Sequence, residues 1–227
     1  MNKSIVFKSL NKIGIALTAL TAIGFATTNS ASAATVTTLL QDDFNSENSG
    51  VANQSTLDYN QFHKFKVING SVDLIGNGFF DFLPGNGLYV DLDGTTSPSL
   101  AGTLESQEFN FQAGDIVNLS FQLAGNHRNN DTESVIVSLG SLFNGTFSLG
   151  QNEPFTTFTQ SFTVASATNA TLKFQETGAD NIGLLLDNVT LTKSVPEPGS
   201  IMGLLAFGAF GATSLCKRKQ QQSVTNA

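Results

Sequence analysis

The sequence predicts an all-β protein whose working part is an antiparallel β-sandwich. Two observations lead to this fold class. Between residues 35 and 192, short segments alternate apolar and polar side chains with a period of two, which is typical of strands with one buried face. The same region has no sustained helical period, which disfavours a parallel α/β fold because parallel strands need helices between them. Apolar segments outside this region, one at each end of the chain, are predicted to be targeting elements.

The amino terminus has the pattern of a signal peptide over residues 1–33. Lys3, Lys8 and Lys12 precede an apolar run over residues 13–25, and the small residues Ala31 and Ala33 follow at the distance that a signal peptidase needs. We therefore expect cleavage after Ala33. An uncleaved amino-terminal anchor is the alternative, although the run is shorter than the roughly 20 residues that usually span a membrane.

The predicted β-sandwich domain, residues 34–193, is strongly acidic. Residues 34–195 contain five Lys and Arg against seventeen Asp and Glu, a formal charge of −12. Nucleic acid is therefore not an expected partner, because binding to phosphate requires cationic side chains. The charge would keep an exported protein soluble and could collect divalent cations. Cys216 is the only cysteine and lies outside this domain, which accordingly has no disulfide and no thiol nucleophile.

Strands are expected in a regular succession along the domain. The strongest is residues 115–125, where Val117, Leu119 and Phe121 alternate with polar side chains. In chain order, the expected strands lie within residues 62–68, 71–75, 87–92, 103–111, 115–125, 132–140, 158–166, 171–176 and 182–192. Clusters of Gly, Asn and Asp at 83–87, 125–131 and 176–180 predict turns between them. About ten strands at this spacing indicate a sandwich, and no repeat at a fixed period indicates a propeller or a solenoid.

Three stretches resemble the jelly-roll domains of galactose-binding-like proteins and carbohydrate-binding modules. They are "GLYVDLDGT" at 87–95, "FNFQAGDIVNLSFQLAGN" at 109–126 and "LLLDNVTL" at 184–191. The resemblance covers roughly residues 41–191 and implies a jelly-roll sandwich. It also implies carbohydrate binding as an expectation, although a fold does not by itself assign a function.

Candidate ligand residues come from one strand and two turns. In residues 87–93, Leu88, Val90 and Leu92 share the inner face, so the opposite face is expected to meet water. The candidates are Asn86, Tyr89, Asp91 and Asp93 around this strand, and Asn126, His127 and Arg128 in the turn at 125–131. Tyr89, Asp91 and Asp93 would form a polar platform for a sugar or a cation, or simply a solvated face. The absence of Trp argues against a sugar-stacking surface.

The last strand offers a candidate calcium site. Asp187 shares its parity with Val189 and Leu191, which predicts a carboxylate facing the core, and an unpaired buried carboxylate is costly. The resemblance implies a structural calcium held by Asp187 together with oxygens near the first strand, where Asp43 is the chosen ligand among Asp42, Asp43 and Glu47. A bulge that turns Asp187 outward, or hydrogen bonds from turn amides, is the alternative.

No catalytic constellation is recognisable in the domain. His63 and His127 stand apart from any known nucleophile, metal-binding or nucleotide-binding motif and are interpreted as surface residues. Seventeen carboxylates guarantee acidic pairs by chance, so they do not predict a glycosidase. We therefore expect a protein that is not an enzyme, and no cofactor apart from the calcium considered above.

The carboxyl terminus carries the most specific motif. Pro196 and Pro198 flank Glu197 after Val195, an apolar run follows, and the basic cluster Lys217, Arg218 and Lys219 closes it. This order resembles the PEP-CTERM sorting signal of Gram-negative bacteria, over residues 194–219, with a transmembrane helix at 199–216 and a polar cytoplasmic tail at 220–227. The resemblance implies recognition by an exosortase, removal of the tail, and delivery to the surface or extracellular matrix. A plain tail anchor is the alternative.

These features give one functional hypothesis with two rivals. The chain is predicted to be an exported, noncatalytic protein of the cell surface or the exopolysaccharide and biofilm matrix, with carbohydrate or calcium-dependent contacts. Signal peptidase and exosortase would process it after transient retention in the inner membrane. The rivals are a secreted polysaccharide-active enzyme and a purely structural matrix protein.

Overall fold

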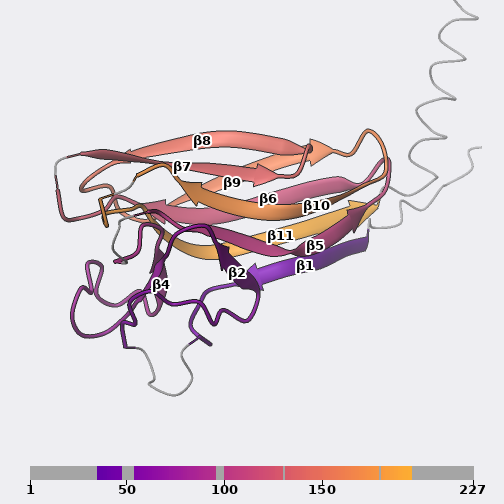
Figure 1. The fold of residues 1–227 in the computed structure, drawn as a ribbon. Helices are drawn as coiled ribbons and strands as arrows, with labels where there is room; N and C mark the ends of the chain where they lie inside the picture. The colour runs from indigo at the N-terminus through magenta and orange to yellow at the C-terminus, as the bar shows by residue number, and fades with distance from the viewer. Residues whose placement is uncertain (1–34, 48–53, 96–99, 130, 179, 196–227) are drawn as a thin grey trace, which may run out of the picture. The chain divides into compact units, whose positions relative to one another are not determined.

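The computed structural model describes residues 35–47, 54–95, 100–129, 131–178 and 180–195, and these residues form eleven β-strands (Figure 1). The strands are β1 (Thr35–Asp42), β2 (Phe65–Ile68), β3 (Asp73–Ile75), β4 (Tyr89–Asp91), β5 (Thr103–Phe111), β6 (Ile116–Ala124), β7 (Thr132–Leu139), β8 (Phe143–Gly150), β9 (Thr156–Thr163), β10 (Thr168–Glu176) and β11 (Leu185–Val195). All strand pairings between them are antiparallel, so the predicted all-β class is confirmed.

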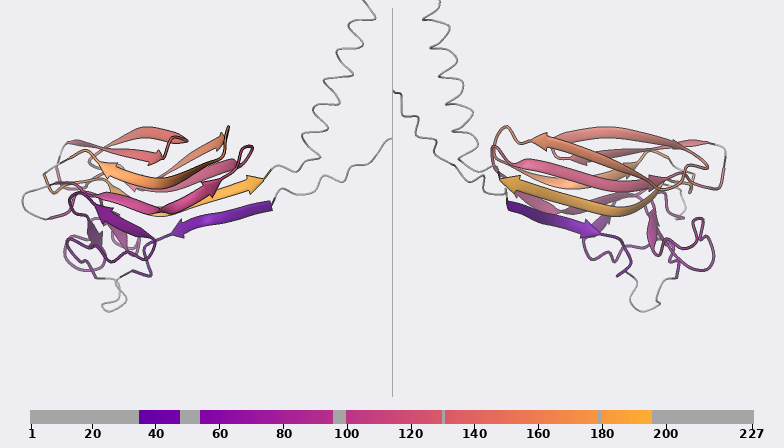
Figure 2. Two further views of the ribbon diagram at one scale, coloured as in Figure 1. Left: turned by 45° about the vertical axis from the view of Figure 1, so that its right-hand side comes forward. Right: turned by 180° about the vertical axis from the view of Figure 1, so that it is seen from behind.

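The strands form two sheets that pack face to face. One sheet has the order β3-β4-β11-β6-β9, with β1 also paired to β11, and the other has the order β2-β5-β10-β7-β8. Phe121 of β6 meets Phe174 of β10 across the interface, with ring centroids 5.4 Å apart. This two-sheet arrangement fits the predicted jelly roll (Figure 2).

The alternation in the sequence sets the core. Along β6, Val117, Leu119 and Phe121 are completely buried, and the polar residues between them are half-buried. The strands β5 and β6 lie within one residue of their expected limits. The strand β8 was not among the expected strands; it forms a hairpin with β7 around Gly140, whose φ of 50° suits glycine.

Both ends of the described domain meet at one place. Thr35 at the start of β1 pairs with Val195 at the end of β11, so the first and last strands run side by side (Figure 1). The last strand extends two residues past the expected domain limit at 193. The expected signal peptide at 1–33 and transmembrane helix at 199–216 lie outside the described residues. Within those residues, no helix is long and apolar enough to cross a membrane.

Candidate functional site

The polar face of β4 is covered by loops, which corrects one expectation. Leu88, Val90 and Leu92 belong to the main core, as their parity predicts. Tyr89, Asp91 and Asp93 were expected to meet water, but all are completely buried. Segments that follow β3, β6 and β10 close over this face, as their contacts with these three residues show. The supposed platform is therefore a buried polar layer beneath three loops.

An ion pair lies at the centre of this layer. Arg128 Nη2 is 2.5 Å from Asp91 Oδ2, and Arg128 Nη1 donates a hydrogen bond to the carbonyl of Asn181. The other Asp91 oxygen accepts the backbone N–H groups of Asp93 and Gly183, each at 3.1 Å. Burial raises the pKa of Asp91 well above its ordinary value, against the lowering effect of the Arg128 charge. The positive charge of Arg128 thus stabilises the ionised form of the buried Asp91 carboxyl group.

Asp93 organises the loop that follows β10. Its Oδ2 accepts the backbone N–H groups of Asp180 at 3.0 Å and Asn181 at 3.1 Å, and its Oδ1 is buried without a hydrogen-bond partner among the described residues. Gly183 is required here because a Cβ would lie 2.5 Å from the backbone nitrogen of Asp93. Burial raises the pKa of Asp93.

Asn126 plays a similar structural part in the loop after β6. Its side-chain oxygen accepts the backbone N–H groups of Arg128 and Asn129, and its amide nitrogen donates to Asn129 and Glu133. Asn126 is completely buried, so it positions Arg128 rather than reaching solvent. His127 Nε2 lies 3.3 Å from the carbonyl of Glu153, at the rim of this loop.

The ion pair lines a pocket that also includes two phenylalanine rings. The pocket has a volume of about 150 Å³ and is lined by Asp73, Ile75, Phe80, Phe82, Asp91, Thr95, Arg128 and Asn181. The guanidinium carbon of Arg128 is 4.8 Å from the centroid of the Phe82 ring, which fixes the side chain by a cation–π contact. Phe80 is 51% exposed, so its ring offers an apolar surface at the mouth. We call this the Arg128 pocket.

The other expected ligand residues lie beside the Arg128 pocket rather than in it. Asn86 is exposed and its side chain bonds the carbonyl of Leu83. The Tyr89 hydroxyl accepts the backbone N–H groups of Phe82 and Leu83 and bonds Asp81, and burial raises the pKa of Tyr89. These contacts hold the loop at residues 81–83 in place. The exposed pair Phe79 and Phe80, which sequence reasoning missed, was visible as adjacent aromatics in a Gly-rich turn.

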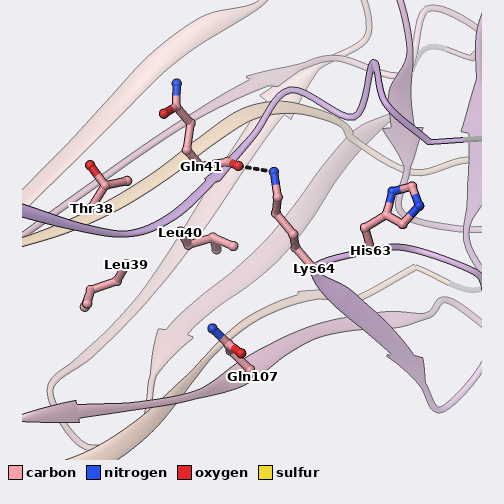
Figure 3. Close-up of a pocket in the computed structure, with 7 residues that line it drawn as sticks. All are labelled: Thr38, Leu39, Leu40, Gln41, His63, Lys64 and Gln107. Atoms are coloured by element: carbon pink, nitrogen blue, oxygen red, sulfur yellow. Dashed lines mark hydrogen bonds between the residues drawn. The ribbon is translucent and has the colours of Figure 1, made fainter.

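A second hollow lies between β1, the two residues just before β2, and β5 (Figure 3). Its volume is about 330 Å³, and it is lined by Thr38, Leu39, Leu40, Gln41, His63, Lys64 and Gln107. Lys64 is already engaged, because Nζ donates to the carbonyl of Gln41 and lies 3.7 Å from Asp42. His63 remains exposed and its Nδ1 lies 3.2 Å from the buried Glu47. The lining has no phenylalanine or tyrosine ring, and its lysine is bound internally, so we favour the Arg128 pocket.

The candidate calcium ligands come close together, but the parity that suggested them is wrong. The strand β11 has a bulge between Asp187 and Thr190, where Asn188 has a φ of 51°. Because of this bulge, Asp187 pairs with Gln122 and lies on the face of the sheet away from the main core, whereas Val189 lies in the core. Asp187 is still buried, at 3% exposed, and accepts the backbone and side-chain amides of Asn188. Burial, together with the nearby carboxylates of Asp43 and Asp42, raises its pKa to about 7.

The carboxylate oxygens beside Asp187 belong to Asp42 and Asp43, and their burial and hydrogen bonding show whether a cation would fit there. Asp42 Oδ2 is buried without a hydrogen-bond partner among the described residues, and burial raises the pKa of Asp42. Asp43 is exposed beside it. The donor chemistry therefore suits calcium. Within the described part of the chain, however, no three acidic, histidine or cysteine side chains converge closely enough to hold a metal ion as they stand.

Comparison with known proteins identifies the carboxyl-terminal segment. Residues 194–219 match the PEP-CTERM protein-sorting motif, so the chain carries this signal, as its sequence predicts. The match begins at Ser194, within β11. No curated protein matches the chain in sequence.

Solved structures show distant likeness to the domain. The K3 cleaved adhesin domain of Lys-gingipain from Porphyromonas gingivalis is 17% identical with a TM-score of 0.45, covering 70% of this chain and 99% of that one. An exo-β-1,3-galactanase from Phanerochaete chrysosporium is 15% identical with a TM-score of 0.36, covering 62% of this chain. The N-terminal CBM22-1–GH10 modules of Clostridium thermocellum xylanase 10B are 16% identical with a TM-score of 0.38, covering 68%. The chain spans 29% and 28% of the galactanase and xylanase chains.

Proposed function

We propose that this chain is an exported, noncatalytic surface or extracellular-matrix protein that an exosortase processes. The PEP-CTERM motif at residues 194–219 is the observation that carries the proposal. The pairing of Thr35 with Val195 supports it, because both processing sites would then flank one edge of a folded domain. The proposed parts are a signal peptide at 1–33, a sandwich at 34–193, a sorting segment at 194–219 and a tail at 220–227.

The sorting part of the proposal has a direct genetic test. Replacing Pro196 and Pro198 together with alanine removes the feature that distinguishes the motif from a plain anchor. The variant is expected to stay in the membrane fraction at full length, whereas the unchanged chain leaves it. A matched control replaces Pro154, in the turn before β9. Release of the double variant at the normal rate would leave the tail without a sorting role.

The Arg128 pocket is the proposed site of carbohydrate binding. Sugars present apolar C–H faces and edges of hydroxyl groups, and the lining of the pocket combines the exposed Phe80 ring with the polar residues Asp73, Thr95 and Arg128. Arg128 is held by Asp91 and Phe82, so its remaining donor capacity would meet a ligand without a large ordering cost. The ion pair is internally neutral, which suits an uncharged sugar.

The same contacts favour binding over hydrolysis. A glycosidase needs one carboxyl group as acid and one as base or nucleophile, both facing the glycosidic bond. Asp91 is bound to Arg128 and two backbone amides. Asp73 accepts hydrogen bonds from the backbone of Asp58 and from both the backbone and the hydroxyl of Thr95. Both carboxylates in the pocket thus hold the fold together.

We propose further that calcium binds at Asp43 and Asp187, whose side chains must move to reach one ion, since no three carboxylates of the described residues converge as they stand. Two observations support a cation at this place: Asp42 Oδ2 is buried without a hydrogen-bond partner among the described residues, and burial, with a smaller contribution from the carboxylates of Asp43 and Asp42, raises the pKa of Asp187. Bound calcium would supply charge neutralisation between β1 and β11. Addition of a chelator is expected to lower the melting temperature of the purified protein. An unchanged melting curve would contradict calcium binding at this place.

Carbohydrate binding is tested with a glycan array, with and without calcium. The unchanged protein is expected to retain a subset of neutral oligosaccharides. Phe80→Ala should lose that signal, and Phe79→Ala is the matched control, because Phe79 is similarly exposed but does not line the pocket. Equal loss in both variants would argue against the pocket, and no binding by the unchanged protein would leave a structural role. Reducing-sugar release from a bound polysaccharide would favour the enzymatic rival.

A further inference from the structure

The strand β9, Thr156–Thr163, forms an open edge of its sheet. Within the described residues, β6 is its only hydrogen-bonded neighbour strand. Its sequence TTFTQSFT contains no charged residue, no proline and no glycine. Natural sheets usually protect an edge with a charge, a proline, a bulge or a very short strand, because the open backbone groups can pair with another chain. The eight-residue strand β9 has none of these protections.

The opposite side of the sandwich is protected. There β2 and β3 are only four and three residues long and carry Lys66 and Asp73. The strand β1 receives a lysine from a neighbouring segment: Lys64, just before β2, donates a hydrogen bond from Nζ to the carbonyl of Gln41 in β1 (Figure 3). The two sides of one domain therefore treat their edges differently, and only the side of β8 and β9 leaves long strands without such protection (Figure 1).

The two faces of β9 are chemically distinct. Phe158, Gln160 and Phe162 pair with Phe121, Leu119 and Val117 of β6, so they face the core side. Thr157, Thr159 and Ser161 lie on the exposed face. The Phe158 ring stacks on Phe121 at 5.7 Å, and the Phe162 ring stacks on Phe143 of β8 at 6.1 Å, yet both phenylalanines remain only partly buried.

The charge distribution selects a second copy of the chain as the occupant of this edge. Glu153 is the only charged residue between Ser134 and Leu172, although residues 34–195 carry a formal charge of −12. The exposed acidic residues of the domain therefore lie mostly outside this segment, so two copies can approach here with the least charge repulsion. An identical strand also brings the same uncharged hydroxyl and aromatic groups, which make favourable cross-strand pairs.

We propose that two copies pair antiparallel through β9, about a two-fold axis at Gln160. In this register Phe158 lies opposite Phe162 of the second copy on the core side, and Thr159 lies opposite Ser161 on the exposed side. Each partly buried phenylalanine then gains an aromatic neighbour, and the backbone groups of both edges are paired. The contact is isologous, so it closes as a dimer and leaves the Arg128 pockets of both copies open.

Disulfide trapping tests both the contact and its register. In the full chain with Cys216→Ser, a cysteine introduced at position 160 would face its own copy, at about 4.5–5.5 Å between Cα atoms for directly opposed residues. This falls within the roughly 4.4–6.8 Å that a disulfide spans. Gln160→Cys is expected to give a covalent dimer on oxidation in intact membranes, reversed by reduction. The matched control, Gln175→Cys, lies exposed on the central strand β10 and should stay monomeric.

A second pair of variants separates the contact from crowding in the membrane. Thr159→Glu with Ser161→Glu places charge on the exposed face of β9, and it should abolish the trapping that Gln160→Cys gives. Gln175→Glu, which adds charge on the central strand β10, should leave trapping unchanged. Equal dimer yields at positions 160 and 175 would overturn the proposal, and so would full trapping in the doubly charged variant.

Discussion

The loop end of the sandwich and its β8–β9 side use charge in opposite ways. At the loop end, Asp91, Asp93, Glu133 and Glu176 are all buried and are held by backbone amides, an arginine or an asparagine. In residues 135–171, which include β8 and β9, Glu153 in the connecting turn is the only charged residue. This acidic domain thus buries many of its carboxylates, which hold the loops around the Arg128 pocket, whereas the β8–β9 side, where we propose association, has almost no charge.

Removing Arg128 should produce the largest effect, because the loop end depends on its charge. Arg128→Met leaves Asp91 buried without its partner, and breaking a buried pair in this way costs about 3–5 kcal/mol. Urea unfolding of the purified protein measures this loss. Lys173→Met is the matched control, since the Lys173 side chain is 39% exposed and Glu105 keeps Lys66 as a second partner, so the loss should be about 1 kcal/mol. Similar losses in both variants would mean that the loop end is not built on the Asp91–Arg128 pair.

The pH dependence of stability should distinguish the two regions next. Burial raises the pKa of Glu176 from 4.5 to about 7, so its folded form binds a proton more tightly than its unfolded form. This contribution is fully present below pH 4.5 and is lost as the pH rises through about 7, a loss on the order of 3 kcal/mol. Glu133 and Asp93, which lie close by, have raised pKa values and act in the same direction.

Denaturant unfolding at several pH values checks the contribution of Glu176. Glu176→Gln should flatten the decline between about pH 5 and pH 7, relative to the unchanged protein. A slope that Glu176→Gln does not change would assign the pH dependence to other groups.

The exposed aromatic of the Arg128 pocket should affect binding much more than folding. Phe80 is half-exposed, so Phe80→Ala is expected to change the free energy of unfolding by no more than about 1 kcal/mol. The affinity of the Phe80→Ala variant for an oligosaccharide that the unchanged protein retains on the array should fall by roughly tenfold. Calorimetric titration with that oligosaccharide makes the measurement. Unchanged affinity would place the ligand elsewhere, with the hollow beside Lys64 as the next site to examine.

The smallest effect on stability is expected at the neutral edge. Ser161 is exposed, so Ser161→Glu should alter the free energy of unfolding by within about 0.5 kcal/mol. It should nevertheless weaken pairing of two copies, which analytical ultracentrifugation detects as a shift toward monomer. A stability loss of several kcal/mol would show that this edge is structural within one chain.

The sequence predicted the strands well because their alternation is a local property. It located β5 and β6 closely and assigned the inner face of Leu88, Val90 and Leu92 correctly. The strand β8 was not predicted because Gly145 and Gly150 interrupt its alternation of apolar and polar residues. The bulge at Asn188 reversed the parity of Asp187; it was the alternative considered from the sequence, and an asparagine, which readily takes a positive φ, was its one local signal.

The pocket was harder to predict because it depends on contacts between distant segments. Asp91 was expected in water, but Arg128 and Gly183 reach it from 37 and 92 positions along the chain. Sequence reasoning selected Asp91 and Arg128 as candidates without pairing them. Parity shows which side of a strand faces the core, but it does not show whether a loop covers the other side.

The assignments to both regions depend on the domain being delivered outside the cell, so the mature chain gives the most direct test. Intact mass measurement of the protein recovered from the extracellular matrix and from membranes locates both processing sites at once. The matrix form is expected to begin at Ala34 and to end close to the Pro196–Pro198 segment, with the membrane fraction holding the longer precursor. A matrix form that retains residues beyond Gly199 would contradict the sorting model.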